Sequence, residues 1–535
     1  MKILAIIPAC EGSIDLPNRN IRIINGKPLI YYSINNAKNS KYIDDIIVSS
    51  NSEIILSIAK QMGVDTRRRD TDLANPNVPL DEVIYDVMNG IESKQYDYVV
   101  TMQSISPNLK PETLDNAIIN IIDNNYDTVI SVTKKQKYFW KIDEGKPIAL
   151  YTARTSKLSR TPFYEETGAF LITKPEFITK TNRVGENVYL YELNDEEALD
   201  VFTFGDLKLV EKLQSVKKVA FYVNGNNKRG VGHIYRALEL ADEFYCKPDI
   251  YYDINQTDVK IFGSTTHNLI PVNGIADLFK CCETQKYDLF INDILTTSID
   301  YMIGLKSVLP DAKIVNFEDD GEGQIKADLV FNALLSHNDL SNVYSGEKYY
   351  ISGKMFMFYE PIKIRDKVEK MFISFGGADP QNYSDRLLNI ISKPEYSDYN
   401  FVVVLGRAKS NINMLLEFNK YPNIEVLYDV KNMPEIMSQC DIAITSRGRT
   451  GYELAILGIP SIAMAQNERE EKHGFVSNEN GFTYIGLNPA DEVIESNVKM
   501  YLSMKAATRS RFQKMLLSHN LKDGRRRIMN LIDNL

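Results

Sequence analysis

Short apolar runs alternate with longer amphipathic stretches along most of the chain. Residues 2–8 form the first apolar run, a loop rich in Gly, Ser, Pro and Asn follows, and residues 28–38 then have a helix-like pattern. The same order recurs with further buried-strand runs at residues 45–49, 98–102 and 127–132. Repeated strand-loop-helix units predict a parallel sheet covered by helices on both faces.

The pattern restarts near residue 217. Residues 218–223 form a new apolar run, a Gly-rich turn follows, and residues 234–244 again look helical. A fresh strand-loop-helix unit begins a new sheet, so we expect a domain 1–216 and then a two-lobed α/β part, divided into 217–360 and 361–535. The strand-like runs expected in the two lobes are residues 289–292, 312–316, 329–332, 370–375, 400–405, 424–427, 441–445 and 460–464.

Length and composition agree with several globular domains. The 535 residues exceed what one hydrophobic core holds, and 44% hydrophobic with 25% charged residues is ordinary for a globular protein. A net charge of −9 without a basic-aromatic stripe argues against nucleic acid as a partner. No apolar run is long enough to span a membrane, and the five scattered cysteines suit reduced thiols, so we expect a cytoplasmic protein. The arginine clusters 67–69 and 525–527 are interpreted as solvated faces.

The loop after the first strand is the first candidate site. Ligands of open α/β sheets bind beyond the carboxyl ends of the strands, where loop amides and helix N-termini receive phosphates. Here that loop covers residues 8–20 and leads to a Gly-Lys-Pro-Leu-Ile segment at residues 26–30. The sequence therefore predicts a nucleotide-phosphate site at this edge.

These segments resemble the acylneuraminate cytidylyltransferase family. Its opening reads IPARGGSKGIPRKN followed by GKPLI, which residues 8–20 and 26–30 match in part. Residues 48–54 resemble the family's VSTDSEEI, residues 103–107 resemble QPTSP, and residues 168–170 stand in place of NGAIY. The resemblance spans about residues 1–213 and implies a nucleotidyltransferase Rossmann-like fold.

The resemblance also implies an activity and its residues. In the family, CTP binds at the first loop, and the anomeric hydroxyl of a nine-carbon keto sugar acid, a nonulosonic acid, attacks the α-phosphate with help from Mg²⁺. The matched positions imply a metal-binding role for Asp200 and a possible homodimer. They imply nucleotide-binding roles for Gly12, Ser13, Arg19, Asn20, Gln103 and Ser106.

Three charged positions of the family are changed in this chain. Cys10 replaces the loop arginine, Ile14 replaces the lysine after Gly-Ser, and Phe202 replaces the second aspartate of the metal-binding pair. Each lost charge costs on the order of 10²-fold in rate where a transition state is stabilised by charge. Either other cations such as Arg19 and Lys27 compensate, or the domain is weakened, altered in substrate or retained for structure.

A second motif follows the new strand at residue 217. Residues 230–236 read Gly-Val-Gly-His-Ile-Tyr-Arg, and a histidine at the mouth of a helix is well placed for proton transfer near neutral pH. The motif resembles GxGHxxR of the UDP-sugar hydrolase of pseudaminic acid synthesis and its spore-coat relatives, within the GT-B group. Residues 374–380, 445–454 and 458–461 match further segments in family order.

This second resemblance implies a catalytic acid/base at His233. It implies nucleotide-binding roles for Gly376, Gly377, Ser446, Gly448, Thr450 and Glu453, with Glu453 accepting hydrogen bonds from ribose hydroxyls. Substrate-binding roles fall to Gly232, Arg236, Asn467 and His473. The first strand and loop of this part, beginning at residue 218, differ from those of the hydrolases. Tyr222 and Asn224 occupy positions where the hydrolases have Arg and Asp.

Three hypotheses follow for the whole chain. The first is a bifunctional enzyme of nonulosonic acid biosynthesis, in which one part transfers CMP from CTP to a sialic-acid-like sugar and the other hydrolyses a UDP-sugar. The second is a GT-B-type glycosyltransferase with a degenerate nucleotide-binding N-terminal domain. The third is a non-catalytic scaffold of decayed domains.

Overall fold

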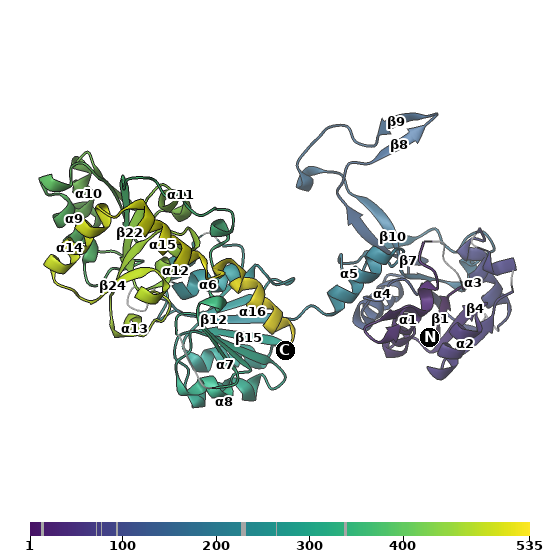
Figure 1. Cartoon of the computed structure of the whole chain (residues 1–535). Helices are drawn as coiled ribbons and strands as arrows, with labels where there is room; N and C mark the ends of the chain where they lie inside the picture. The colour runs from purple at the N-terminus through teal and green to yellow at the C-terminus, as the bar shows by residue number, and fades with distance from the viewer. Residues whose placement is uncertain are drawn as a thin grey trace. The chain divides into compact units, whose positions relative to one another are not determined.

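The chain forms two compact units, Met1–Val216 and Lys217–Leu535, in the computed structural model (Figure 1). The structure describes residues 1–11, 15–70, 72–75, 77–91, 95–225, 232–263, 265–335 and 340–535. Gly12, Ser13 and Ile14 of the first loop lie outside the described residues, as do Gly230 and Val231 of the second motif.

A seven-stranded sheet in the order β11-β7-β10-β6-β1-β4-β5 forms the centre of the first unit. Every pairing is parallel except those of β10, which runs antiparallel to both β6 and β7. The sequence analysis predicted a parallel sheet from four apolar runs and did not predict β10, the antiparallel strand. The chain reaches β10 from a hairpin excursion, and no crossover helix turns it back into parallel register. The strands are β1 Ile3–Pro8, β4 Asp45–Ser50, β5 Asp65–Arg68, β6 Tyr98–Thr101, β7 Thr128–Lys135, β10 Phe163–Thr173 and β11 Val188–Glu192.

Both faces of this sheet are covered, as the sequence pattern predicts. Ile3, Ala5 and Ile7 of β1 pack into one core cluster, whereas Leu4 and Ile6 pack into another. Side chains alternate between the two faces of a strand, so an uninterrupted apolar run needs apolar cover on both sides. The covering helices are α1 Leu29–Asn39, α2 Glu53–Gln61, α3 Leu80–Asn89 and α4 Pro111–Asp123, and α5 Phe204–Gln214 ends the unit.

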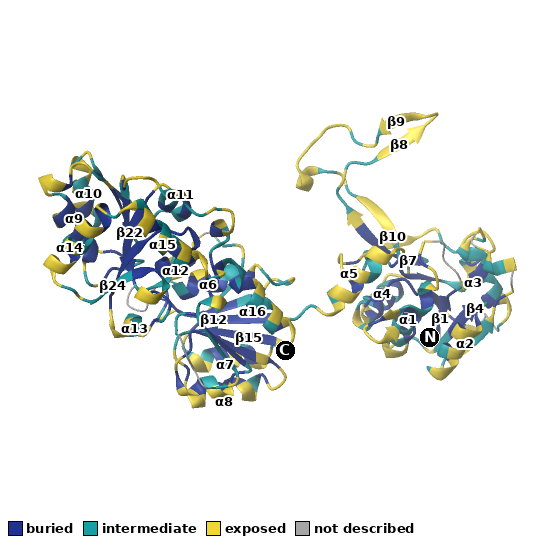
Figure 2. Ribbon diagram, in the orientation of Figure 1, coloured by how far each residue is buried: buried dark blue, intermediate teal, exposed yellow. Residues whose placement is uncertain are grey.

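A two-stranded hairpin of β8 Trp140–Asp143 and β9 Lys146–Ala149 forms a sheet of its own. It extends away from the first unit and is largely exposed (Figure 2). Three of its large apolar side chains face solvent, since Trp140 is 54%, Ile142 71% and Ile148 41% exposed. We call residues 140–149 the arm; the sequence analysis did not predict it.

The second unit contains two parallel sheets, which confirms the expected α/β class. The first lobe has seven strands in the order β14-β13-β12-β15-β16-β17-β18, and the second has six in the order β21-β20-β19-β22-β23-β24. The strands are β12 Val219–Val223, β13 Asp249–Asp253, β14 Asn268–Val272, β15 Leu289–Asp293, β16 Lys313–Phe317, β17 Leu329–Asn332, β18 Val343–Ser345, β19 Lys370–Ser374, β20 Asn400–Leu405, β21 Ile424–Tyr428, β22 Ile442–Ser446, β23 Ser461–Ala465 and β24 Phe482–Leu487.

Helices cover both lobes, and the last one returns to the first lobe. Ile528 and Ile532 of α16 belong to the same core cluster as Val219 of β12. The second unit thus begins and ends in the first lobe, although the residues of the second lobe lie between in sequence. The helices are α6 Gly232–Ala241, α7 Ile275–Glu283, α8 Ile299–Val308, α9 Tyr383–Ile391, α10 Ile412–Leu416, α11 Met433–Ser438, α12 Arg449–Ile456, α13 Glu468–Glu471, α14 Asp491–Leu502, α15 Ala506–Leu517 and α16 Gly524–Asp533.

The interpretation of the two arginine clusters as solvated faces was wrong at two positions. Arg525 is 6% exposed and pairs through Nη2 with Glu239 Oε2 at 2.6 Å and through Nη1 with Glu243 Oε1 at 2.7 Å. These pairs hold α16 against α6 of the first lobe. Arg69, also 6% exposed, lies inside the first unit. The other four arginines of these clusters are more exposed to solvent. A run of like charges in a sequence does not indicate which of its side chains will be buried.

Two smaller predictions concern the whole chain. Within the described residues, no helix combines the length and apolar character needed to cross a membrane. None of the five cysteines, all of which are described, forms a disulfide.

Candidate active sites

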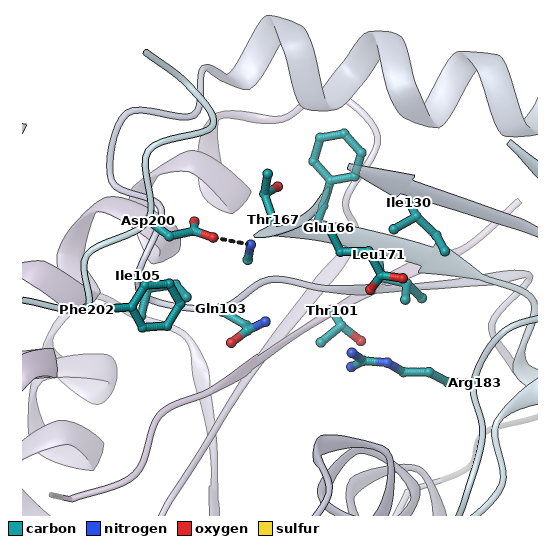
Figure 3. A pocket seen from close by; sticks show the side chains of 12 residues that line it. Thr101, Gln103, Ile105, Ile130, Glu166, Thr167, Leu171, Arg183, Asp200 and Phe202 are labelled. Atoms are coloured by element: carbon teal, nitrogen blue, oxygen red, sulfur yellow. Dashed lines mark hydrogen bonds between the residues drawn. The ribbon is translucent and has the colours of Figure 1, made fainter. Parts of the chain in front are cut away.

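The first unit has a pocket at the carboxyl end of β6 (Figure 3). Thr101 ends β6 and Gln103 follows it, while Ile130 comes from β7. The remaining lining residues come from the loop after β6, from β10, from the loop after β10 and from the segment before α5: Ile105, Glu166, Thr167, Gly168, Phe170, Leu171, Arg183, Asp200 and Phe202. Gln103 and Asp200, two of the residues expected from the sequence, therefore share one pocket.

Asn20 connects the first loop to the segment after β6 by hydrogen bonds. Its Nδ2 donates to the carbonyl of Cys10 at 2.7 Å, and its Oδ1 accepts from Ser104 Oγ at 2.5 Å. Asn20 is 4% exposed, so both ends of its amide are used by the protein itself. In the described residues, Asn20 shapes the loop, and its expected contact with nucleotide stays a prediction.

Arg19 is half-buried at the pocket's edge beside Phe202. Its guanidinium lies 5.6 Å from the centre of the Phe202 ring, and its buried Nε has no hydrogen-bond partner. Burial lowers the pKa of Arg19, while the nearby Cys10, Asp15 and Asp200 act in the opposite direction. Arg19 thus takes up the space beside the residue that replaces the family's second aspartate.

Asp200 is the one carboxylate at the expected metal position. It accepts hydrogen bonds from Ser106 Oγ and, at 2.8 Å, from the backbone N–H of Gly168. Burial raises its pKa, and these two donors act against the rise. The described residues contain no group of three or more His, Cys, Asp or Glu side chains arranged for a metal. Mg²⁺ at phosphate sites often uses one or two carboxylates and completes its shell with phosphate oxygens and water. Asp200 fits that minimal role as a single ligand.

Sequence reasoning missed Arg69, which ends up beside the first loop. Its Nη2 donates to the carbonyl of Ser49 at 2.9 Å and its Nε to Ser49 Oγ at 3.3 Å. Burial lowers its pKa, and Cys10 and Asp86 oppose the shift. A guanidinium therefore lies near the position where the family's loop arginine is replaced by Cys10. Its place directly after β5 was the signal that could have identified it.

Arg183 was missed as well, and no motif marks it. It lies in the loop after β10 and its side chain lines the pocket. Its Nε pairs with Asp81 Oδ1 of α3 at 3.3 Å, whereas its buried Nη1 has no partner. Burial lowers the pKa of Arg183, and Asp81 and Glu166 oppose the shift.

The second unit has a buried charge cluster at the carboxyl edge of the first lobe. His233 and Arg236 come from the first turns of α6, and Asp293 ends β15. His233 Nδ1 lies 2.6 Å from Asp293 Oδ1. Arg236 donates to both oxygens of the same carboxylate, from Nη2 at 2.6 Å and from Nε at 2.7 Å. With Nδ1 protonated and donating to Asp293, Nε2 of His233 is left as a hydrogen-bond acceptor.

Glu318 completes this cluster behind Arg236. Arg236 Nη1 donates to Glu318 Oε1 at 3.2 Å, and the backbone N–H of Ala333 donates to the same oxygen at 3.2 Å. Burial alone would raise the pKa of Asp293, but Arg236 and His233 outweigh it and hold that pKa below its ordinary value. Asp293 therefore stays ionised, so it can orient the His233 ring and stabilise a proton on it.

The second lobe approaches this cluster with the N-terminus of α12. A Cβ built on Gly232 would lie 2.9 Å from Arg449 Cδ, so the start of α6 and the Arg449 side chain approach each other closely. Arg449 Nη2 also donates to the carbonyl of Ile351 at 3.2 Å. One turn further along α12, burial raises the pKa of Glu453 to about 7, and Arg449 opposes the rise. The two residues expected to carry proton transfer and ribose binding, His233 and Glu453, thus lie on facing edges.

The other nucleotide-binding candidates gather at the carboxyl ends of β19 and β22. Gly376 has φ +73°, and a Cβ on Gly406 would lie 2.5 Å from Gly377 Cα, so the loops are close-packed. Ser446 ends β22, Gly448 precedes α12, and Thr450 lies in its first turn. The fold brings these residues to one edge, and their contacts with a nucleotide stay a prediction.

The remaining two candidates have structural partners. Asn467 is exposed and caps α13, since its side chain accepts from the N–H of Glu470 at 2.9 Å. The helix α13 ends at Glu471, so His473 lies outside the helix that contains Arg469. It is 5% exposed, its Nδ1 lies 2.7 Å from the carbonyl of Arg447, and burial lowers its pKa to about 4. His473 also forms a β-bridge with Leu335 of the first lobe.

Known proteins match both parts of the chain. The profile of a cytidylyltransferase family matches residues 4–225. CMP-N,N'-diacetyllegionaminic acid synthase of Legionella pneumophila is 30% identical over 230 residues, which cover 41% of this chain and 99% of that protein. The spore coat polysaccharide biosynthesis protein SpsG of Bacillus subtilis is 24% identical over 47% of this chain and 78% of its own length.

Two further matches differ in the share of the matched protein that they cover. An uncharacterized protein of Methanocaldococcus jannaschii is 29% identical over 283 residues, and this chain spans only 57% of that protein's length. Among solved structures, MurG of Acinetobacter baumannii is 12% identical with a TM-score of 0.46, covering 60% of this chain and 100% of its own.

Proposed function

The chain belongs to the cytidylyltransferase family through residues 4–225, and from this premise we propose that its first unit transfers CMP from CTP to a nonulosonic acid. The observation that carries the proposal is the pocket in which Gln103 and Asp200 meet beside Arg19. The anomeric hydroxyl oxygen bonds to the α-phosphorus, its proton passes to water, and pyrophosphate leaves with the electrons of the broken P–O bond.

Positioning of the reactants and neutralisation of charge dominate nucleotidyl transfer, and different residues of the chain would provide each. Asn20 and Ser104 hold the first loop in place. Arg19 and Arg69 supply positive charge near the position of Cys10. Asp200 would hold Mg²⁺, which supplies charge neutralisation for the triphosphate when bound. Gln103, at the end of β6, lies where it can orient the sugar hydroxyl.

The test is pyrophosphate release from CTP, Mg²⁺ and a panel of nonulosonic acids. We expect release with one or more sugar acids and none without a sugar acid. The same mixture with Asp200→Asn should lose at least 100-fold in rate, while Asp195→Asn, an exposed change in the segment just before it, should leave the rate unchanged. No release across the panel, with CTP bound normally, would contradict the proposal.

For the second unit, the His233–Asp293 pair supports hydrolysis of a UDP-sugar. Nε2 of His233 would take a proton from water as the water oxygen bonds to the anomeric carbon, and UDP would leave with the electrons of the broken C–O bond. Glu453 would accept from the ribose hydroxyls, and Gly376, Gly377, Ser446, Gly448 and Thr450 would surround the phosphates. The SpsG relative supports a role in polysaccharide biosynthesis, which fits this proposal.

A UDP-sugar without an acceptor distinguishes the three hypotheses for this unit. Prompt UDP release by the whole chain supports hydrolysis. Release that needs an added sugar acceptor supports the GT-B-type glycosyltransferase instead. If the native chain releases no UDP with or without an acceptor, and His233→Ala leaves UDP-sugar binding unchanged, the unit is a scaffold and the proposed activity is excluded.

We also propose that the first unit pairs with a second copy through the arm. Isolated exposed apolar residues are common, but Trp140, Ile142 and Ile148 lie together on ten residues that have no core of their own. Sedimentation should give a dimer for the native chain and a monomer for a Trp140→Ser, Ile142→Ser double variant. A native chain that sediments as a monomer would exclude the dimer.

A further inference from the structure

One arginine of the second lobe contacts the backbone next to the buried charge cluster of the first lobe. Arg469 lies in α13, two residues after Asn467, and its Nη2 donates to the carbonyl of Glu318 at 3.0 Å. Its Nη1 lies 3.8 Å from Asp320 Oδ2, so the carbonyl is the closer partner. Glu318 follows β16 directly. The second lobe therefore reaches the carboxyl edge of the first lobe's sheet through this side chain.

The loop that presents this carbonyl is held firmly by the first lobe itself. Glu318 has φ +52°, a left-handed conformation that residues other than glycine seldom adopt. The next residue, Asp319, is buried, and its carboxylate accepts from Thr297 N–H at 2.9 Å and from Thr297 Oγ1 at 2.6 Å. It also accepts from Gly321 N–H at 3.0 Å and from Asn316 Nδ2 at 2.7 Å. Because so many bonds fix the loop, the unusual backbone persists and the Glu318 carbonyl has a defined direction.

Glu318 joins this contact between the lobes to the buried charge cluster. Its carbonyl accepts from Arg469, whereas its carboxylate accepts from Arg236 Nη1 at 3.2 Å. Arg236 in turn is bonded to Asp293, which lies beside His233. The carbonyl on which the second lobe rests and the proposed proton acceptor thus belong to one buried network. A shift of the second lobe against this carbonyl is therefore also a shift against His233.

Two neighbouring contacts use the same kind of acceptor. Tyr452 of α12 donates from its hydroxyl to the carbonyl of Ala333 at 2.9 Å, and Gly474 N–H donates to the carbonyl of Leu334 at 3.0 Å. These acceptors follow β17, next to the end of β16 where Arg469 binds. One hydrogen bond would leave the lobes free to rotate about it, whereas contacts at two strand ends fix an orientation.

We propose that Arg469 is a positioning residue that holds the second lobe, and with it the bound nucleotide, in register with His233. In this role it acts through the Glu318 carbonyl without touching the reacting atoms. Proton transfer to Nε2 of His233 needs the sugar nucleotide in place, and a misplacement of about 1 Å costs up to about 100-fold in rate. The inference rests on the UDP-sugar chemistry proposed for the second unit.

The test compares the native chain with Arg469→Met, which removes the donor and keeps a long side chain. The kcat for UDP release from a UDP-sugar should fall about 10-fold or more, because a charged donor between the lobes is lost. The Kd for UDP should change less than about twofold, since the nucleotide-binding candidates lie in the second lobe. Arg469→Lys keeps a charged donor and should restore kcat to within about threefold of the native value.

Arg386→Met is the matched control for Arg469→Met. Arg386 is 22% exposed, pairs with Asp491 Oδ1 at 2.6 Å and donates to the carbonyl of Pro489, all within the second lobe. It should leave kcat unchanged. A native kcat in Arg469→Met, an equal loss of kcat in Arg386→Met, or a parallel loss of kcat and UDP affinity in Arg469→Met would overturn the inference.

Hydrogen exchange separates this inference from the proposed function. The Gly474 N–H bonds across the two lobes, so its exchange rate reports their contact without any catalysis. Fragment-resolved mass spectrometry should give exchange at least about tenfold faster in Arg469→Met than in the native chain or Arg386→Met. If the native chain releases no UDP but Gly474 responds in this way, the proposed chemistry is wrong and Arg469 still fixes the lobes. Equal exchange in the native chain and Arg469→Met would overturn its role.

Discussion

The pocket of the first unit and the buried charge cluster of the second use polar groups in opposite ways. In the pocket and at its edge, Thr101 Oγ1, Arg183 Nη1 and Arg19 Nε are buried without partners. In the second unit, His233, Arg236, Asp293 and Glu318 are also buried, yet each is bonded to another member. The first arrangement leaves hydrogen-bonding capacity for a ligand, whereas the second uses it to fix one side chain.

The difference predicts where mutations change stability and where they change activity. Removing an unpaired polar atom from the pocket region breaks no hydrogen bond at that atom, so most of the effect should appear in substrate kinetics. Removing a member of the paired cluster leaves another buried charge without compensation, so its effect should appear in folding as well. The following four changes test this contrast.

Asp293→Asn should give the largest effect. The amide cannot neutralise Arg236, and breaking a buried charge pair costs about 3–5 kcal/mol of unfolding free energy. Urea unfolding of the second unit checks the stability, and UDP release should fall at least 100-fold. Asp320→Asn is the control, because Asp320 is 38% exposed and lies 3.8 Å from Arg469; it should cost less than about 1 kcal/mol. Equal losses of unfolding free energy in the two variants would contradict the proposed difference between the pocket and the buried charge cluster.

His473 should make the second unit less stable in acid. Its pKa is about 4 in the folded chain and near 6.5 when unfolded, so between these values only the unfolded chain binds the proton. The free energy of unfolding therefore rises with pH across this window, by about 3 kcal/mol in total for this group. Urea midpoints of the native chain and of His473→Asn between pH 4 and 7 isolate the contribution. Parallel pH profiles would show that His473 titrates normally in the fold.

Arg19→Ala should lower CMP transfer about 100-fold, because a cation at the triphosphate stabilises charge in the transition state. Folding should change little, since the buried Nε has no partner to lose. Arg22→Ala is a matched control: Arg22 also lies over an aromatic ring, that of Phe204 at 5.0 Å, but Phe204, unlike Phe202, does not line the pocket. A similar loss of activity in both variants would point to loop stability instead of charge.

Glu453 should make nucleotide binding to the second unit depend on pH near neutrality. Burial raises its pKa to about 7, and only the ionised carboxylate accepts from two ribose hydroxyls at once. UDP affinity should therefore increase as pH rises from 6 to 8, by up to about tenfold. In Glu453→Gln this dependence should disappear. Calorimetric titration of UDP at three pH values measures it, and a flat profile in the native chain would exclude this role.

Element order was predictable to a large extent. The apolar runs at residues 2–8 and 218–223 became β1 and β12, and the structure divides the chain between Val216 and Lys217. Buried strands need continuous apolar residues, which is a local property of the sequence. The antiparallel β10 and the arm were not predictable in this way, because strand direction depends on how the chain returns to the sheet.

The site residues likewise fall into those identified from the sequence and those identified only from the structure. The resemblance to family motifs identified Gln103, Asp200, His233 and Glu453 as candidate site residues, because such motifs can be recognised in the sequence itself. Only the tertiary structure brought Asp293 to His233 from 60 residues away and Arg183 into the pocket of Thr101. Partners of this kind are joined by the packing of separate strands and loops. Whether a charge is paired, unpaired or solvated therefore depends on the folded surroundings, and three adjacent arginines at residues 67–69 can differ completely.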